Sequence, residues 1–199
     1  MLAMRPLSGL RTTLVSPSSH TPYSGMLPGL VAGHYSFEET HIDLARLCQW
    51  AGVRFIEGEV TALDPAARRL SLAGRPDIDY DLVSLDIGSG PEMDSVPGAR
   101  EHAVPVKPVA GLWQRWRDLH QRVLARSGEG AYRIAVVGGG AGGVELVLAM
   151  AHRLADLPLG FDLWCGGEQI LPGYNHRARA AVEAALERQG VAVHTASRV

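Results

Sequence analysis

Three glycines in the second half of the chain have the spacing of a phosphate-binding turn. Gly138, Gly140 and Gly143 form G-x-G-x-x-G, directly after the apolar run 134–137. Apolar residues then recur at helical spacing from Val144, so the order is strand, glycine turn, helix. A turn of bare backbone at the positive end of a helix offers N–H donors to a diphosphate. The pattern therefore predicts a binding site for the pyrophosphate of a dinucleotide.

Each glycine of the pattern has its own expected task. The first permits a tight turn, the second lets the backbone approach the phosphate, and the third lets the helix pack closely on the strand. The alternative is a glycine-rich turn without a ligand, and the flanking strand and helix argue against it. The candidate binding residues of the turn are Gly138, Gly139, Gly140, Ala141, Gly142 and Gly143.

The composition excludes several classes of protein. With 199 residues, 46% of them hydrophobic, and a net charge of -2, the chain has neither the basic excess of a nucleic-acid binder nor the profile of a disordered protein. The apolar run 144–151 is too short to span a membrane, and the N-terminus lacks the apolar core of a signal peptide. We therefore expect a soluble cytoplasmic protein without a transmembrane segment or a nucleic-acid partner.

Cysteine, histidine and tryptophan show no further reactive pattern. Cys48 and Cys165 lack C-x-x-C or metal-ligand spacing and are expected to be buried apolar residues. The eight histidines lack the spacing of metal ligands, and we expect surface or structural roles for them. Trp113 and Trp116 recur on an amphipathic helix, which favours a place in the core over an aromatic cofactor site.

The first half of the chain alternates between strand and helix patterns. The expected elements are a strand at 10–16, an irregular loop at 16–29, a helix from Glu38 that stops at Gly52, a strand at 53–56, a hairpin of 60–63 with 69–72, and a buried strand at 82–87. A hairpin between a helix and a parallel strand predicts a three-layer fold with a small β-meander on one face.

The second half predicts a complete βαβαβ unit. The proline-rich segment 91–108 marks a boundary, and a helix follows it from Leu112 towards Gly128. The unit then comprises a strand at 133–137, a helix at 142–155, a strand at 161–165, a helix at 175–189 and a strand at 191–195. Right-handed crossovers give a parallel sheet with the glycine turn at its carboxyl edge, where such folds bind ligands.

Three segments resemble those of a known family. Residues 20–33, 80–89 and 137–145 are similar to segments of the FAD- and NAD(P)H-dependent pyridine nucleotide-disulfide oxidoreductases, especially the branch of type II NADH dehydrogenases. The first segment and residues 86–89 also resemble a flavoprotein domain fused to selenide, water dikinase. The resemblance implies an α/β fold of the FAD/NAD(P)-binding Rossmann type, with a parallel sheet and a β-meander insertion.

The resemblance also implies a reaction and residue roles. Hydride would pass from NAD(P)H to flavin, with the glycine turn holding the NAD(P)H pyrophosphate. Glu145, in the first turn of the helix, would lie on the nicotinamide side, although a carboxylate also suits a helix N-terminus for electrostatic reasons alone. Gly88 and Ser89 would approach FAD. The implied domains are a partial FAD-binding domain at 1–105, a linker helix at 106–130 and a partial NAD(P)H-binding domain at 131–199.

The sequence departs from the family pattern in two respects. The family's FAD domain opens with its own strand, glycine loop and helix, which we do not find in 1–105, so the chain resembles an internal fragment that has lost its FAD pyrophosphate site. A carboxylate commonly binds the adenosine ribose at the end of the second strand. Ser16 and Cys165 occupy those two positions, while Glu168 follows three residues later, so the choice between NADH and NADPH stays open.

Three hypotheses follow for the function of the chain. It is part of an FAD-dependent NAD(P)H oxidoreductase and inactive alone, or it is a non-catalytic NAD(P)-binding or interaction module. The third hypothesis is completion by a partner, either the missing segments or a second copy in a homodimer, because unpaired strand edges need cover. The sequence leaves the electron acceptor open among a quinone, a small oxidised molecule and a selenium compound.

Overall fold

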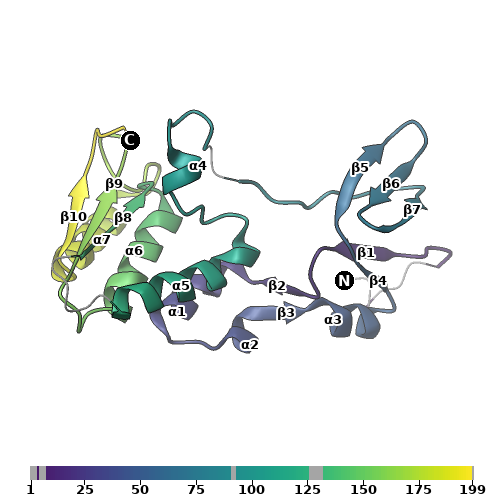
Figure 1. The fold of residues 1–199 in the computed structure, drawn as a ribbon, viewed down its shortest axis with the longest axis horizontal. Coiled ribbons are helices and arrows are strands. Elements are labelled where there is room, and N and C mark those ends of the chain that lie inside the picture. Colours follow the sequence, from purple (N-terminus) through teal and green to yellow (C-terminus); the bar gives the residue numbers. More distant parts are fainter. Residues whose placement is uncertain (1–3, 5–7, 91–92, 126–131, 199) are drawn as a thin grey trace. The chain divides into compact units, whose positions relative to one another are not determined.

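The computed structural model describes residues 4, 8–90, 93–125 and 132–198, and it has the α/β architecture that the sequence predicts (Figure 1). Its contacts divide the chain into two compact units. One unit comprises residues 1–23 and 38–88, and the other comprises residues 24–37 and 89–199. The functional division at residues 105 and 130 stays a prediction, because compactness does not assign cofactors to domains.

The first unit contains three small sheets. Strands β1 (Thr13–Ser16) and β4 (Arg54–Glu57) are parallel, and β2 (His20–Pro22) and β3 (His41–Asp43) are antiparallel. The third sheet comprises β5 (Val60–Asp64), β6 (Arg69–Leu72) and β7 (Arg75–Asp79) in an antiparallel meander. The hairpin of β5 and β6 is confirmed, and Asp64 fixes its turn by accepting the N–H groups of Ala66 and Ala67 at 2.9 and 2.8 Å.

The single helix expected from Glu38 to Gly52 is wrong. The structure has α2 (Phe37–Thr40), then β3, then α3 (Leu44–Ala51). The interruption arises because β3 pairs with β2, and Asp43 then caps α3 by accepting the N–H of Arg46 at 2.9 Å. The end is as predicted, since Gly52 takes the left-handed conformation with φ 65°.

The buried strand expected at 82–87 is also wrong. The structure assigns no strand to this segment, and the exposed fractions of Leu82 and Ile87 are 91% and 88%. A strand needs a neighbour for its backbone N–H and C=O groups. The parallel sheet of this unit has two strands in the part of the chain that the structure describes, and neither pairs with this segment.

The second unit begins with a short helix that the sequence did not indicate. Residues 16–29 were expected to be irregular, but β2 is followed by the 3-10 turn Ser24–Met26 and by α1 (Leu27–Ala32). Proline is tolerated in a first helical turn, and Pro28 is the second residue of α1. Leu27, Leu30 and Val31 are buried, and α1 packs against α6 (Ala141–Arg153). Tertiary packing therefore outweighs the local composition.

The second unit continues from residue 89 with short helices before a longer one. These are α4 (Ala99–His102), the 3-10 turn Val109–Gly111 and α5 (Leu112–Ala125), and the last confirms the helix predicted from Leu112. Gly128, its predicted end, lies outside the described residues. Trp116 is buried in the core and Trp113 packs against it, which confirms their place in the core.

The predicted βαβαβ unit is confirmed in every element. It comprises β8 (Tyr132–Val137), α6, β9 (Leu159–Trp164), α7 (His176–Arg188) and β10 (Val191–His194). The strands are parallel in the order β10-β9-β8 (Figure 1). The core between sheet and helices includes Val147 and Leu163, both with an exposed fraction of 0%. This unit positions the glycine turn.

Among the described residues, the structure contains no helix long and apolar enough to cross a membrane.

Candidate functional site

The glycine turn connects β8 to α6, as the sequence predicts. Gly138 follows the last residue of β8, and its φ of 124° lies in a region that side-chain-bearing residues rarely adopt. Its N–H donates to the carbonyl of Trp164 at 2.8 Å, which ties the turn to the end of β9. Gly138 therefore allows the tight turn expected of the first glycine.

Two other glycines are needed for packing. A Cβ at Gly143 would overlap the carbonyl oxygen of Gly138, and a Cβ at Gly139 would overlap the thiol of Cys165. The third glycine of the pattern therefore brings the helix against the turn itself. This agrees with the expected close packing of the helix on the strand, since Gly138 directly follows the end of β8.

Gly140 faces open space. Its backbone is extended with φ -77° and ψ 177°, and a Cβ there would meet no heavy atom within 4 Å. Gly140 is the N-cap of α6, and no side chain caps this helix in the described structure. The N–H groups of the first turn therefore lack a side-chain acceptor, which suits them to an external anion.

A pocket of about 530 Å³ lies at this edge of the sheet. Its lining residues are Gly139, Gly140, Cys165, Gly166, Gly167, Glu168, Gln169 and Pro172. The two glycines come from the turn, and the others come from the end of β9 and the loop after it. The turn and Cys165 are thus brought together as the sequence predicts.

Cys165 forms the floor between the turn and the loop. It is buried, as expected, and its N–H donates to the carbonyl of His194 at 2.7 Å. Its thiol lies 3.4 Å from the carbonyl oxygen of Gln169. The sequence pattern did not identify the residues from Gly166 onward as pocket residues. They follow the second strand, where this type of fold binds the adenosine ribose, and that position could have indicated them.

Glu168 is the charged side chain of this pocket lining. In sequence it lies three residues after the usual ribose-binding position. Glu168 and Gly140 nevertheless line the same pocket, because the loop after β9 brings Glu168 back towards the glycine turn.

Glu145 differs from its expected position. It is the fifth residue of α6, beyond the first turn, and its side chain is exposed. It is not part of the described pocket lining. The electrostatic explanation, a carboxylate in the first turn, is therefore wrong, because the helix begins at Ala141. A role beside the nicotinamide stays a prediction.

The residues expected near FAD belong to different units. Ser16 and Gly88 lie in the first unit, and Ser89 lies in the second. The Ser16 hydroxyl accepts the N–H of Ser18 at 3.4 Å, and Gly88 has a φ of 70°. The Ser89 hydroxyl accepts from the ammonium of Lys107 at 3.2 Å. Their roles towards a flavin stay predictions.

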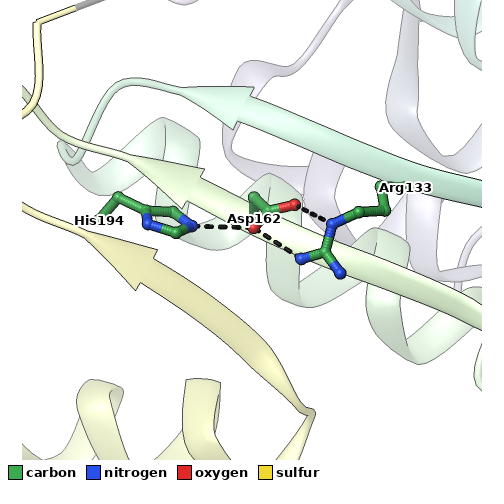
Figure 2. A network of polar contacts seen from close by, with 3 residues as sticks. All are labelled: Arg133, Asp162 and His194. Atoms are coloured by element: carbon green, nitrogen blue, oxygen red, sulfur yellow. Dashed lines mark hydrogen bonds and ion pairs between the residues drawn. The ribbon is translucent and has the colours of Figure 1, made fainter.

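An ionic network joins the three strands β8, β9 and β10 (Figure 2). Asp162 on β9 accepts two hydrogen bonds from Arg133 on β8, at 2.8 and 2.7 Å, and lies 2.9 Å from Nε2 of His194 on β10. These contacts, first with Arg133 and then with His194, lower the pKa of Asp162 below its ordinary value. The sequence analysis missed this network, although an acid within an apolar strand was a signal.

Within the described ranges, no cluster of three or more His, Cys, Asp or Glu side chains could hold a metal ion.

Comparison with known proteins decides the family. A model of the pyridine nucleotide-disulphide oxidoreductases matches residues 1–199. The chain belongs to this family.

Two curated relatives agree with the family and the branch predicted by the resemblance. Demethylphylloquinone reductase NdbB of Synechocystis is 26% identical over 153 residues, which cover 75% of this chain and 37% of the relative. Alternative NAD(P)H-ubiquinone oxidoreductase C1 of Arabidopsis thaliana is 28% identical over 160 residues, covering 73% of this chain and 31% of the relative. The chain thus spans about a third of their length.

A solved structure confirms the fold class. NDH2 of Plasmodium falciparum, in complex with NADH, superposes with a TM-score of 0.76 at 16% identity. The match covers 93% of this chain and 43% of that chain.

Proposed function

We propose that this chain is the NAD(P)H-binding part of an FAD-dependent oxidoreductase, and that the turn 138–143 holds the cofactor's pyrophosphate. The observation that carries the proposal is the open space at Gly140, the N-cap of a helix without a side-chain cap, on the lining of a pocket of about 530 Å³. Family membership supports it. When bound, the nicotinamide supplies a hydride that a flavin accepts.

The residues of the chain have binding and orienting roles in this proposal. The backbone N–H groups that follow Gly140 donate to the pyrophosphate, and the loop after β9 encloses the adenosine side. Cys165 supplies an apolar floor that fixes the distance between turn and loop. No side chain is required as acid, base or nucleophile, because the cofactors provide the chemistry.

The flavin fits this chain less well than the nicotinamide cofactor. Among the described residues, β8 to α6 is the one strand-to-helix connection that carries G-x-G-x-x-G. A second pyrophosphate site of the same kind is therefore not evident in the described first unit. This observation favours a second candidate function, a non-catalytic NAD(P)-binding module. Homodimer formation and a cytoplasmic location stay predictions from the sequence.

Substitution of Gly140 tests the proposed function. Gly140→Val should weaken NADH binding at least about tenfold, about 1.4 kcal/mol, because the side chain would fill the space of the phosphate. The backbone at Gly140 is ordinary, so the fold should tolerate the change. Isothermal titration calorimetry with NADH measures the dissociation constant. Gly90→Val is the control, because Gly90 also faces open space but lies outside the turn and outside the pocket lining. Equal affinities of wild type and Gly140→Val would remove the turn from the site.

A further inference from the structure

The outer wall of the pocket is a loop without regular secondary structure. Residues 165–175 connect β9 to α7, and Glu168, Gln169 and Pro172 of this loop line the pocket. Leu171 has a φ of 51°, a conformation that is unfavourable for a leucine. A loop of this kind keeps one shape only if surrounding groups hold it.

Arg179 holds this loop by two of its carbonyl groups. Its Nε donates to the carbonyl of Ile170 at 3.2 Å, and its Nη2 donates to the carbonyl of Tyr174 at 3.1 Å. The two acceptors lie on either side of Leu171 and Pro172. One rigid guanidinium thus fixes the separation of residues 170 and 174.

The position of Arg179 is electrostatically unfavourable for a helix residue. It is the fourth residue of α7, close to the positive end of the helix dipole, where a cation is disfavoured. No carboxylate forms an ion pair with it in the described structure. The hydrogen bonds to the loop carbonyl groups therefore explain an arginine at this position, whereas the helix dipole does not.

The clamped loop is linked to the phosphate turn. The N–H of Leu171 donates to the carbonyl of Gly139 at 2.7 Å, and Gly139 lines the pocket next to Gly140. Arg179 therefore acts on both walls of the pocket, on the loop directly and on the turn through Leu171.

We infer that Arg179 is a positioning residue that sets the shape of the pocket for the adenosine diphosphate half of NAD(P)H. This inference rests on the proposed function. Arg179 contacts the loop and is not required to contact the ligand. Removal of the guanidinium should therefore weaken binding. The loop would then adopt alternative conformations, and binding would cost the entropy of ordering it.

Calorimetry with NADH and with ADP tests the inference on three variants of the whole chain. Arg179→Gln should weaken binding of both ligands by the same factor, about tenfold, because both contain the adenosine diphosphate half. Arg179→Lys should not restore affinity, because an ammonium lacks the planar fork that joins two carbonyls. Arg177→Gln is the matched control, since Arg177 is exposed on the same turn of α7 and carries the same charge. It should bind as the wild type does.

Hydrogen exchange gives a readout that does not need the ligand. The peptide covering residues 166–174 should exchange faster in Arg179→Gln than in Arg177→Gln, while peptides of β8 and α6 exchange equally in both, which also shows that the variant is folded. Unchanged exchange, or full rescue of binding by Arg179→Lys, would overturn the inference. If the wild type binds neither NADH nor ADP, the proposed function fails, while the exchange result still decides whether Arg179 holds the loop.

Discussion

The glycines of the turn differ in what a side chain would meet there. Gly138 is required by its backbone conformation, while Gly139 and Gly143 are required by contacts with Cys165 and with the turn itself. Gly140 has an ordinary conformation and free space, so nothing in the described fold demands a glycine. A ligand that occupied this space would explain why the position is a glycine.

At the same scale, Glu168 should influence the choice between NADH and NADPH. Its carboxylate lines the pocket and would repel the 2′-phosphate that distinguishes NADPH. Glu168→Gln is expected to improve the affinity for NADPH relative to NADH by about threefold, a modest factor because exposed charges are screened by solvent. Titration of each coenzyme into both proteins measures the ratio.

The control for this prediction is Glu187→Gln, which removes an exposed charge near the other end of α7. An equal ratio of affinities in the wild type and Glu168→Gln would show that the carboxylate does not face the ribose.

At the scale of elements, the ionic network joins the three strands of the second unit. Successive side chains of a strand point to opposite faces, and Phe161 and Leu163 of β9 are buried in the core with the helices. Asp162 therefore lies on the other face, where Arg133 and His194 reach it from the neighbouring strands (Figure 2). The network satisfies an acid that is buried within the sheet.

Asp162→Asn should destabilise the second unit by about 1 kcal/mol. Loss of the charged acceptor leaves Arg133 and His194 without their ionic partner, and such a loss costs about 1–3 kcal/mol of stability. The effect should lie at the lower end of this range, because 59% of the Arg133 side chain is exposed and water can solvate it. Urea unfolding at pH 7 measures the difference. Asp156→Asn, an exposed acid of the same unit, should leave the stability unchanged.

The effect of this substitution should depend on pH. Because the pKa of Asp162 is lowered in the folded state, its contribution is complete above the unfolded value of about 3.9 and is lost as the pH falls through the folded pKa. The stability difference between wild type and Asp162→Asn should therefore decrease as the pH falls below about 4. A constant difference down to pH 2 would contradict the ionic explanation.

At the scale of the whole molecule, the two cofactors should behave differently. The purified 199-residue chain should be colourless, and its melting temperature should rise with NADH and not with FAD, if the glycine turn between β8 and α6 binds NADH as proposed. Thermal shift measurements with each cofactor make the comparison. Yellow protein that releases flavin on denaturation would contradict this prediction and favour the complete oxidoreductase over the non-catalytic module.

The second unit was predictable because its signals are local. The strand 134–137, the glycine turn and the helix behind it each have their own sequence pattern, and a βαβαβ order permits few arrangements. The first unit was less predictable. Helix α1 forms through burial against α6, and β3 interrupts a helical pattern because β2 lies beside it. These are contacts between segments far apart in sequence, which the spacing of apolar residues within one segment cannot reveal.

The sequence by itself determined that a parallel α/β unit carries a glycine turn between its first strand and its first helix, because spacing and apolar periodicity are properties of neighbouring residues. Only the tertiary structure decided what surrounds that turn. The loop after β9, the clamp by Arg179 and the pairing of Asp162 with Arg133 and His194 depend on strand order and side-chain direction. Asp162 and His194 are far apart in sequence, and only the pairing of β9 with β10 brings their side chains within hydrogen-bond distance.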